Sequence, residues 1–143
     1  MTISTSSATW EGGLKTGKGK FEAKSGAFQG AYSFPTRFEG AEGTNPEELL
    51  AAAYAACFSM ALSAGLEKEG NPPTRITTTA SAHMEKVAEG MKITRMKVET
   101  RGIVPGLNQA AFAAAAEGAK NGCPVSQLFK ANIHVDLEAR LES

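Results

Sequence analysis

The segment of residues 45–70 constrains the fold more than any other, because it is predicted to form one long helix that is apolar on nearly every face. Asn45 is a good N-cap, Pro46 suits the first helical position, and Glu48, three residues after the cap, completes a capping box. The middle of the segment is rich in alanine, which lets other elements approach its backbone closely. We expect this helix to end near Lys68 and to be buried on most sides.

The first third of the chain is predicted to be β-structure. Residues 18–24 alternate between charged and small or apolar side chains, the period of a half-buried strand. Ser25-Gly26 signals a turn, and the aromatic residues of the segment 28–34 share one parity, which predicts a hairpin. A strand containing Trp10 is expected before it, and residues 35–43 are expected to form a loop.

Three further strands are predicted in the second half of the chain. Residues 76–87 carry their polar side chains on one face, and residues 91–104 form the next strand, whose apolar phase slips near Arg95 as at a β-bulge. The last strand is indicated by strict alternation of polar and apolar residues from Asn132 to Leu141.

Two helices are predicted between the last two strands. Asn108 is a candidate cap for a second alanine-rich helix, residues 109–120, which Asn121-Gly122 is expected to end. Cys123-Pro124 then begins a short helix that runs to about Phe129.

The predicted order of elements is βββ-α-ββ-α-β, which indicates an α+β fold with an antiparallel sheet and helices on one face. We interpret residues 1–143 as a single domain. One face of a small sheet cannot surround a helix that is apolar all round. A second subunit supplies the missing cover, so a homodimer is expected.

Composition narrows the class of function. The 143 residues carry no net formal charge and no basic block, which argues against nucleic acid as the main partner. The first residues lack the pattern of a signal peptide, and the long apolar helix contains polar residues and has charged flanks, which favours a core helix over a membrane span. We therefore expect a cytoplasmic protein, in which a transient disulfide is allowed and a permanent one is disfavoured.

Other apparent motifs do not meet the requirements of their chemistry. Gly12-x4-Gly17-Lys18 resembles a phosphate-binding loop, but Gly19 follows where Ser or Thr is needed and a strand follows instead of a helix, so a turn is expected. His83 and His134 are distant from each other and from the cysteines, and both fall on the polar parity of strands. That pattern is typical of surface histidines and provides neither a zinc site nor a base for a cysteine hydrolase.

The two cysteines, Cys57 and Cys123, are the strongest candidates for chemistry. Cys57 lies inside the long helix, where an inert core thiol is the default and where apolar surroundings raise a thiol pKa, so a reactive Cys57 needs a nearby cation. Arg37 is a candidate for that cation, although Arg37 alone reads as a surface residue paired with Glu39 or Glu42. Cys123 begins a helix, whose dipole lowers a thiol pKa. The residues alone leave the roles of the two thiols open.

Two segments carry a resemblance to a known family. Residues 44–62, Thr-Asn-Pro-Glu-Glu-Leu-Leu-Ala-Ala-Ala-Tyr-Ala-Ala-Cys-Phe-Ser-Met-Ala-Leu, and residues 119–126, Ala-Lys-Asn-Gly-Cys-Pro-Val-Ser, closely resemble the OsmC/Ohr family, and specifically its osmotically induced OsmC branch. The likeness extends over nearly the whole chain, including residues 8–12 and 36–40. It implies antiparallel sheets packed around two central alanine-rich helices in an intertwined homodimer, with active sites at the subunit interface.

The resemblance also implies an activity and a set of roles. Family members reduce organic hydroperoxides to alcohols with thiols, without metal or organic cofactor, in defence against oxidative or osmotic stress. Cys57 matches the cysteine that attacks the peroxide, and Cys123 matches the one that resolves the sulfenic acid as a disulfide. Arg37 matches the family's arginine and is expected to stabilise the thiolate and the peroxide. Glu47 matches the family's glutamate and is expected to orient the Arg37 guanidinium through a bidentate pair. An external thiol, with a dithiol as the expected class, completes the cycle.

Helix geometry adds a hypothesis about the subunits. Glu48 already has a role in the capping box, which leaves Glu47 as the freer carboxylate. Ten residues of helix rise about 15 Å, too far for Glu47 to serve the Cys57 of its own chain. Arg37 and Glu47 are thus predicted to act on the other subunit. Phe58, Met60 and Phe38 are further expected to line a pocket for alkyl or lipid peroxides.

Two competing interpretations remain open at this stage. One is a disulfide oxidoreductase that passes electrons between thiols. The other is a stress-induced binding protein whose cysteines only pack.

Overall fold

The computed structural model describes residues 1–130 and 133–143, in two compact units, residues 1–49 and residues 50–143. Asn132, which was included in the predicted last strand, lies outside the described residues. The order of elements is β1–β2–β3–α1–α2–β4–β5–α3–α4–β6. This mixed α+β order confirms the predicted class, and α1 is the one helix of the four described that the sequence did not predict.

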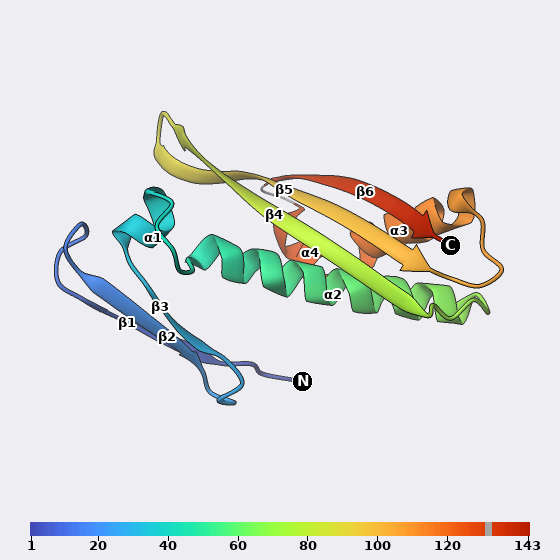
Figure 1. The fold of residues 1–143 in the computed structure, drawn as a ribbon, viewed down its shortest axis with the longest axis horizontal. Helices are drawn as coiled ribbons and strands as arrows, with labels where there is room; N and C mark the ends of the chain where they lie inside the picture. Colours follow the sequence, from blue (N-terminus) through green and yellow to red (C-terminus); the bar gives the residue numbers. More distant parts are fainter. Residues whose placement is uncertain (131–132) are drawn as a thin grey trace. The chain divides into compact units, whose positions relative to one another are not determined.

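The first unit is an antiparallel sheet followed by a short helix. Its elements are β1 (Ser6–Glu11), β2 (Lys18–Ala23), β3 (Gln29–Tyr32) and α1 (Phe34–Phe38), with the strands in the order β1-β2-β3 (Figure 1). The rings of Trp10 and Tyr32 pack over Gly19, where any Cβ would collide with both. The Gly12–Lys18 segment connects β1 to β2 as a turn, as predicted, with Gly12 at φ +92°.

The expectation of a loop over residues 35–43 is wrong at its start. Ser33 caps α1 by accepting a hydrogen bond from the Thr36 N–H at 3.3 Å, while the Ser33 N–H donates to Thr36 Oγ1 at 2.9 Å. Pro35 in the first turn has the φ that a helix needs, so this reciprocal cap nucleates one short helix. The hairpin strand is correspondingly shorter than expected, because Phe34 belongs to the helix.

The second unit contains a three-stranded sheet with helices on one face. After α2 (Pro46–Lys68), which begins at the end of the first unit, come β4 (Arg75–Val87), β5 (Gly90–Ile103), α3 (Gln109–Gly122), α4 (Pro124–Phe129) and β6 (His134–Glu142). Figure 1 shows α2 running along β4. One core joins the helices to the inner face of the sheet; among its buried members are Tyr54, Phe58, Leu62, Leu66, Met96, Val98, Phe112, Ala116, Cys123 and Val135.

The sheet of the second unit is mixed, whereas the prediction was a purely antiparallel one. β4 pairs with β5 in antiparallel register, but β6 pairs with β5 in parallel. A parallel neighbour requires a crossover connection, and α3 and α4 provide it between β5 and β6. The predicted bulge is confirmed, because His83 pairs with Arg95 and Met84 with Ile93, which leaves Thr94 as the extra residue.

The long helix α2 has nearly the predicted ends but not the predicted burial. Asn45 Oδ1 accepts from the Glu48 N–H at 2.8 Å, so the cap forms. The Glu48 carboxylate accepts instead from Thr44 Oγ1 at 2.6 Å, so the capping box is only half formed. Gly70, at φ +86°, follows the end of the helix.

A single stripe of α2 is buried in the chain, not most of its sides. The buried residues recur every four positions, and the residues on the remaining surface include the 77% exposed Met60. By length and composition alone α2 is apolar enough to cross a membrane, yet its buried stripe belongs to the core of the second unit. The exposed apolar remainder is what the predicted second subunit would cover.

The helix α3 ends at a different residue from the one predicted. Asn108 caps α3 as predicted, accepting from the Ala111 N–H at 2.8 Å. The helix continues through Gly122, which does not adopt positive φ, and ends where Cys123 turns to φ −60° and ψ 126°. Pro124 disfavours helical backbone at the residue before it, so the proline, rather than Asn121-Gly122, ends α3.

Candidate active site

The two cysteines, 66 residues apart in sequence, are neighbours in the second unit. The Cys123 thiol donates a hydrogen bond to Cys57 Sγ, with the sulfurs 2.9 Å apart, and both are free thiols. Cys57 comes from the middle of α2, and Cys123 is the residue at which α3 ends and α4 begins. Atoms this close need little movement to form a disulfide, whose S–S length is about 2.05 Å.

The residues around each thiol explain why the two sulfurs lie close together. Tyr54 and Phe58 bury the stripe of α2 that flanks Cys57 and hold that face against the core. Cys123 is held by its own N–H, which donates to Ala119 O at 2.8 Å, and by the extended conformation that Pro124 imposes. The Gly-Cys-Pro sequence therefore turns the chain at one defined residue and presents its thiol to α2.

The two thiols differ in burial, a difference that the sequence alone did not reveal. Cys123 is fully buried, and Cys57 is partly exposed. Burial raises the pKa of the Cys123 thiol, the hydrogen bond to Cys57 raises it further, and the N–H groups of Ser126 and Val125 at the start of α4 act in the opposite direction without prevailing. The start of α4 therefore lowers the pKa of Cys123 as expected, but desolvation outweighs this contribution and the net pKa is raised.

Sequence reasoning missed a second pair of side chains beside the thiols. Tyr54 Oη and Ser126 Oγ form a hydrogen bond of 2.7 Å, and both residues are buried. Burial raises the pKa of Tyr54, the hydrogen bond to Ser126 lowers it, and the charges of Cys123 and Cys57 raise it, so the phenol lies within electrostatic reach of both sulfurs. The signal was present in the spacing, since each residue is three positions from a cysteine.

Arg37 and Glu47 meet each other within the first unit. Arg37 Nε and Nη2 donate to the same carboxylate oxygen, Glu47 Oε1, at 2.9 and 2.6 Å. The predicted partnership with Glu47 is present, and the alternative of pairing with Glu39 or Glu42 is not seen among the described residues. The contact is not a two-oxygen fork, because both N–H groups converge on one oxygen.

The surroundings of the Arg37–Glu47 pair favour a fixed geometry. Glu47 is only 7% exposed, and the Arg37 guanidinium lies 5.1 Å from the centre of the Phe38 ring. A buried carboxylate that accepts two charge-assisted hydrogen bonds holds the planar guanidinium in one orientation.

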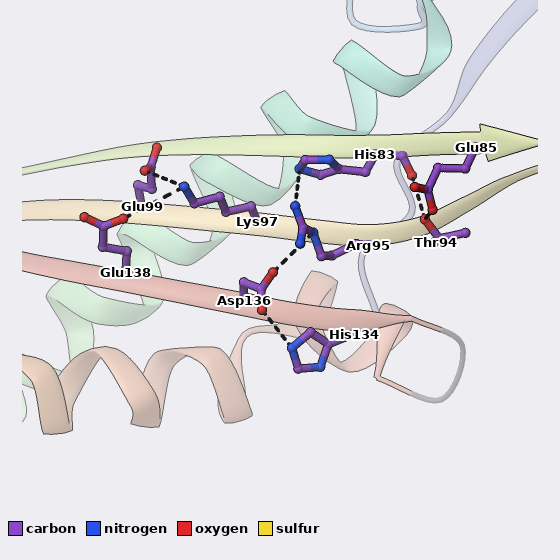
Figure 2. Close-up of polar contacts among 9 residues, drawn as sticks. All are labelled: His83, Glu85, Thr94, Arg95, Lys97, Glu99, His134, Asp136 and Glu138. Carbon is purple, nitrogen blue, oxygen red and sulfur yellow. Dashed lines mark hydrogen bonds and ion pairs between the residues drawn. The ribbon is translucent and has the colours of Figure 1, made fainter.

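Two of the expected pocket residues do not share a face. Phe58 is fully buried in the core, whereas Met60 is 77% exposed, because two residues of helix rotate a side chain to nearly the opposite side. Phe38 belongs to the first unit. His83 and His134 lie on the outer face of the second sheet, as predicted (Figure 2). The part of the chain that the structure describes contains no cluster of residues suited to a metal ion.

A profile of the family described as OsmC-like protein matches residues 39–138. The chain belongs to this family. It is 48% identical over 134 residues to the peroxiredoxin OsmC of Escherichia coli K12, covering 93% of this chain and 94% of that protein. It is 33% identical over 136 residues to an organic hydroperoxide resistance protein of Xanthomonas axonopodis, covering 93% and 92%. These relatives confirm the predicted OsmC branch.

Solved structures support the same assignment. An organic hydroperoxide resistance protein OsmC from Legionella pneumophila matches with a TM-score of 0.74 and 26% identity over the whole of both chains. An OsmC-like protein from Mycoplasma pneumoniae matches with a TM-score of 0.77 over 99% of both chains at only 11% identity, which shows the fold alone. The fold of this chain is therefore that of OsmC-like proteins.

Proposed function

We propose that this protein is a thiol-dependent peroxidase that reduces organic hydroperoxides to alcohols, with Cys57 as the attacking thiol and Cys123 as the resolving thiol. The observation that carries the proposal is the 2.9 Å separation of the two sulfurs in a chain 48% identical to a peroxiredoxin. Cys57 is the partly exposed member of the pair, which favours it as the thiol that meets substrate.

The cycle has three steps. The Cys57 thiolate attacks one peroxide oxygen, the O–O bond breaks, and the alkoxide leaves and takes up a proton to give the alcohol. Cys57 is left as a sulfenic acid, which Cys123 attacks to form the disulfide and release water. An external thiol then reduces the disulfide by exchange, and a dithiol is the expected class.

Arg37 orients the peroxide, and Glu47 holds the Arg37 guanidinium in place. An ordinary thiol of pKa about 8.5 is already about 10% thiolate near pH 7.5, so lowering a thiol pKa gains at most about tenfold. A larger acceleration requires a cation that orients the peroxide and stabilises the departing alkoxide. The guanidinium of Arg37, held by Glu47, supplies it. An Arg37→Lys protein with full activity contradicts this role.

Stopped-flow mixing of the reduced protein with an alkyl hydroperoxide tests the function. The peroxidase loses two thiols per chain, forms one disulfide and releases one alcohol. A binding protein whose cysteines only pack does none of this. A thiol–disulfide oxidoreductase reacts faster with a disulfide substrate than with the peroxide, and that result overturns the proposal.

We also propose that the active unit is a homodimer in the cytoplasm and that Arg37 and Glu47 act on Cys57 of the partner subunit. The exposed apolar surface of α2 and the long helical spacing between Glu47 and Cys57 support it. A heterodimer of Cys57→Ser and Glu47→Ala chains tests it. If the residues act across subunits, the heterodimer has one intact site and measurable activity, and if they act within one chain, it has none.

A further inference from the structure

Two similar side-chain contacts join α2 to the start of α4, and the contact between the two thiols is one of them. Tyr54 and Cys57 are three residues apart on α2, and Cys123 and Ser126 are three residues apart at the start of α4. The sulfurs meet at 2.9 Å and the hydroxyls at 2.7 Å. Each cysteine therefore has a hydroxyl residue one helical turn away, and the two hydroxyls bind each other as the two sulfurs do.

The short helix α4 depends on such contacts for its position. It has six residues, too few to be stable by its own hydrogen bonds. Besides the Ser126 hydroxyl, the Phe129 ring at its end packs edge-on against the Tyr54 ring, with centroids 5.5 Å apart. Tyr54 thus contacts α4 at two residues that lie about one helical turn apart, and it is itself fully buried.

We propose that the Tyr54–Ser126 hydrogen bond positions Cys123 for resolution, so that it controls how fast the Cys57 sulfenic acid becomes a disulfide and not how fast Cys57 reacts with peroxide. In that step Cys123 sulfur attacks Cys57 sulfur, the S–S bond forms, the S–O bond breaks, and the departing hydroxide leaves as water with the proton of the Cys123 thiol. Both Tyr54 and Ser126 are positioning residues. The inference rests on the proposed function and adds the determinant of its second step.

The physical reason is competition between two fates of the sulfenic acid. Oxidation adds an oxygen atom to Cys57 Sγ, and Cys123 must remain within attacking distance and in line with the S–O bond. Cys123 is buried and its pKa is raised, so few molecules have its thiolate at a given moment and the thiol must already be in place. If α4 shifts, the sulfenic acid persists and a second peroxide molecule oxidises it to the sulfinic acid, with release of a second alcohol.

Tyr54→Phe is the sharpest variant, because it removes one oxygen atom and keeps the ring contacts with Phe58 and Phe129. Ser126→Ala removes the other partner of the same bond. The matched control is Ser59→Ala, which removes a similar hydroxyl contact of α2, from Ser59 Oγ to Thr78 Oγ1 at 2.8 Å, on a side chain that binds β4 instead of α4.

The measurement is a single turnover of reduced protein with excess alkyl hydroperoxide, in which dimedone traps sulfenic acid and mass spectrometry counts disulfide and sulfinic acid. In Tyr54→Phe and in Ser126→Ala we expect disulfide formation to slow by about tenfold while the rate of the first oxidation changes by less than about twofold. The peroxide concentration that converts half of the protein to sulfinic acid falls by about the same factor, roughly tenfold. The double variant shows no further loss.

Several outcomes overturn the inference. Wild-type partitioning between disulfide and sulfinic acid in both variants shows that the bond does not position Cys123. An equal effect of Ser59→Ala shows that any lost hydroxyl contact of α2 is enough. If one variant does not fold, the other carries the same test. A wild-type protein that fails to oxidise with alkyl hydroperoxide overturns the proposed function itself, which is a different result from intact oxidation with unchanged resolution.

Discussion

Two regions of the second unit bring polar side chains to similar distances in opposite surroundings. Between α2 and α4, the sulfurs of Cys57 and Cys123 lie 2.9 Å apart in a site that is largely closed to water. On the outer face of β4, β5 and β6, Lys97 Nζ lies 3.0 Å from Glu99 Oε1, and Arg95 Nε lies 3.2 Å from Asp136 Oδ2 (Figure 2).

These similar distances have different effects on pKa because the surroundings differ. In the closed site burial is the largest influence, and it raises the pKa of Cys123 and of Tyr54. On the open face the partners are the largest influence, so the hydrogen bond to Glu99 raises the pKa of Lys97, and the hydrogen bond to Lys97 lowers that of Glu99. Water screens the open pairs, and each charge there has a hydrated alternative.

The comparison teaches that a short polar contact indicates function only together with its solvent exposure. The outer face has the denser network, since Asp136 also accepts from His134 at 2.7 Å and Arg95 lies 3.5 Å from His83 Nε2. That network pairs charged side chains on a sheet surface that water also reaches. The closed site has fewer groups, but its buried members, Cys123, Tyr54 and Ser126, lack an alternative partner in water, so small changes there have large effects.

The largest effect is expected from Cys57→Ser. A hydroxyl is a far weaker nucleophile toward peroxide than a thiolate, so peroxide consumption falls by at least about a thousandfold. Consumption of an alkyl hydroperoxide with a dithiol reductant measures it. Ser59→Ala, two residues along the same helix, is the control and should retain activity. Substantial activity in Cys57→Ser assigns the attack to Cys123 and reverses the comparison between the two thiols.

Cys123→Ser should have a smaller effect of a different kind. The first oxidation of Cys57 stays within about threefold of the wild-type rate, because the attacking thiol is intact. Without reductant, each chain then loses one thiol instead of two and forms no internal disulfide, and dimedone labels Cys57. If the first oxidation is lost as well, Cys123 has a part in the attack and the proposed division of roles is wrong.

Local sequence signals predicted much of the fold. Asn45 and Asn108 were predicted as caps, and Cys123-Pro124 as a helix start, because each signal acts within about four residues of chain. The slip near Arg95 was visible because a bulge changes the parity of a strand. The parallel pairing of β6 was not predictable in the same way, since it depends on which edge of the sheet the crossover reaches.

The candidate site was predicted only in part, for a physical reason. The helix-dipole argument for Cys123 is local, whereas the core in which Cys123 is buried also contains residues of α2 and β5, which are distant in sequence. Tyr54 was missed because, in an alanine-rich helix that is apolar all round, its spacing of three residues from Cys57 does not by itself show that this face meets α4. The Arg37–Glu47 contact was expected from the family resemblance, and only the structure shows both N–H groups on one oxygen.

A loss of stability at alkaline pH should sharpen the contrast between the regions. Burial raises the pKa of Cys123 above its ordinary 9.0 and that of Tyr54 above its ordinary 10.0. Above those ordinary values the unfolded chain binds fewer protons than the folded one, so the free energy of unfolding decreases as pH rises. Stability is full below about pH 9 and is lost as pH rises through the folded-state pKa values.

Urea unfolding of the reduced protein at about pH 8 and about pH 10 measures this loss. Cys123→Ser removes the contribution of this thiol to the pH dependence. The urea midpoint of the variant should therefore fall less between the two pH values than that of the wild type. Equal losses in the two proteins contradict a raised pKa at Cys123.

The smallest effect is expected from Lys97→Gln on the outer face. The side chain is exposed and bridges Glu99 at 3.0 Å and Glu138 at 3.9 Å, so water replaces what the substitution removes. Peroxide consumption should stay within about twofold and the melting temperature within about 3 °C of wild type. Paired with Tyr54→Phe, it compares one lost polar contact in each region under the same assay. A tenfold loss of activity in Lys97→Gln, with its fold intact, places the outer face in the catalytic cycle, for instance where the reductant binds, and ends the simple contrast between a closed functional site and an open structural surface.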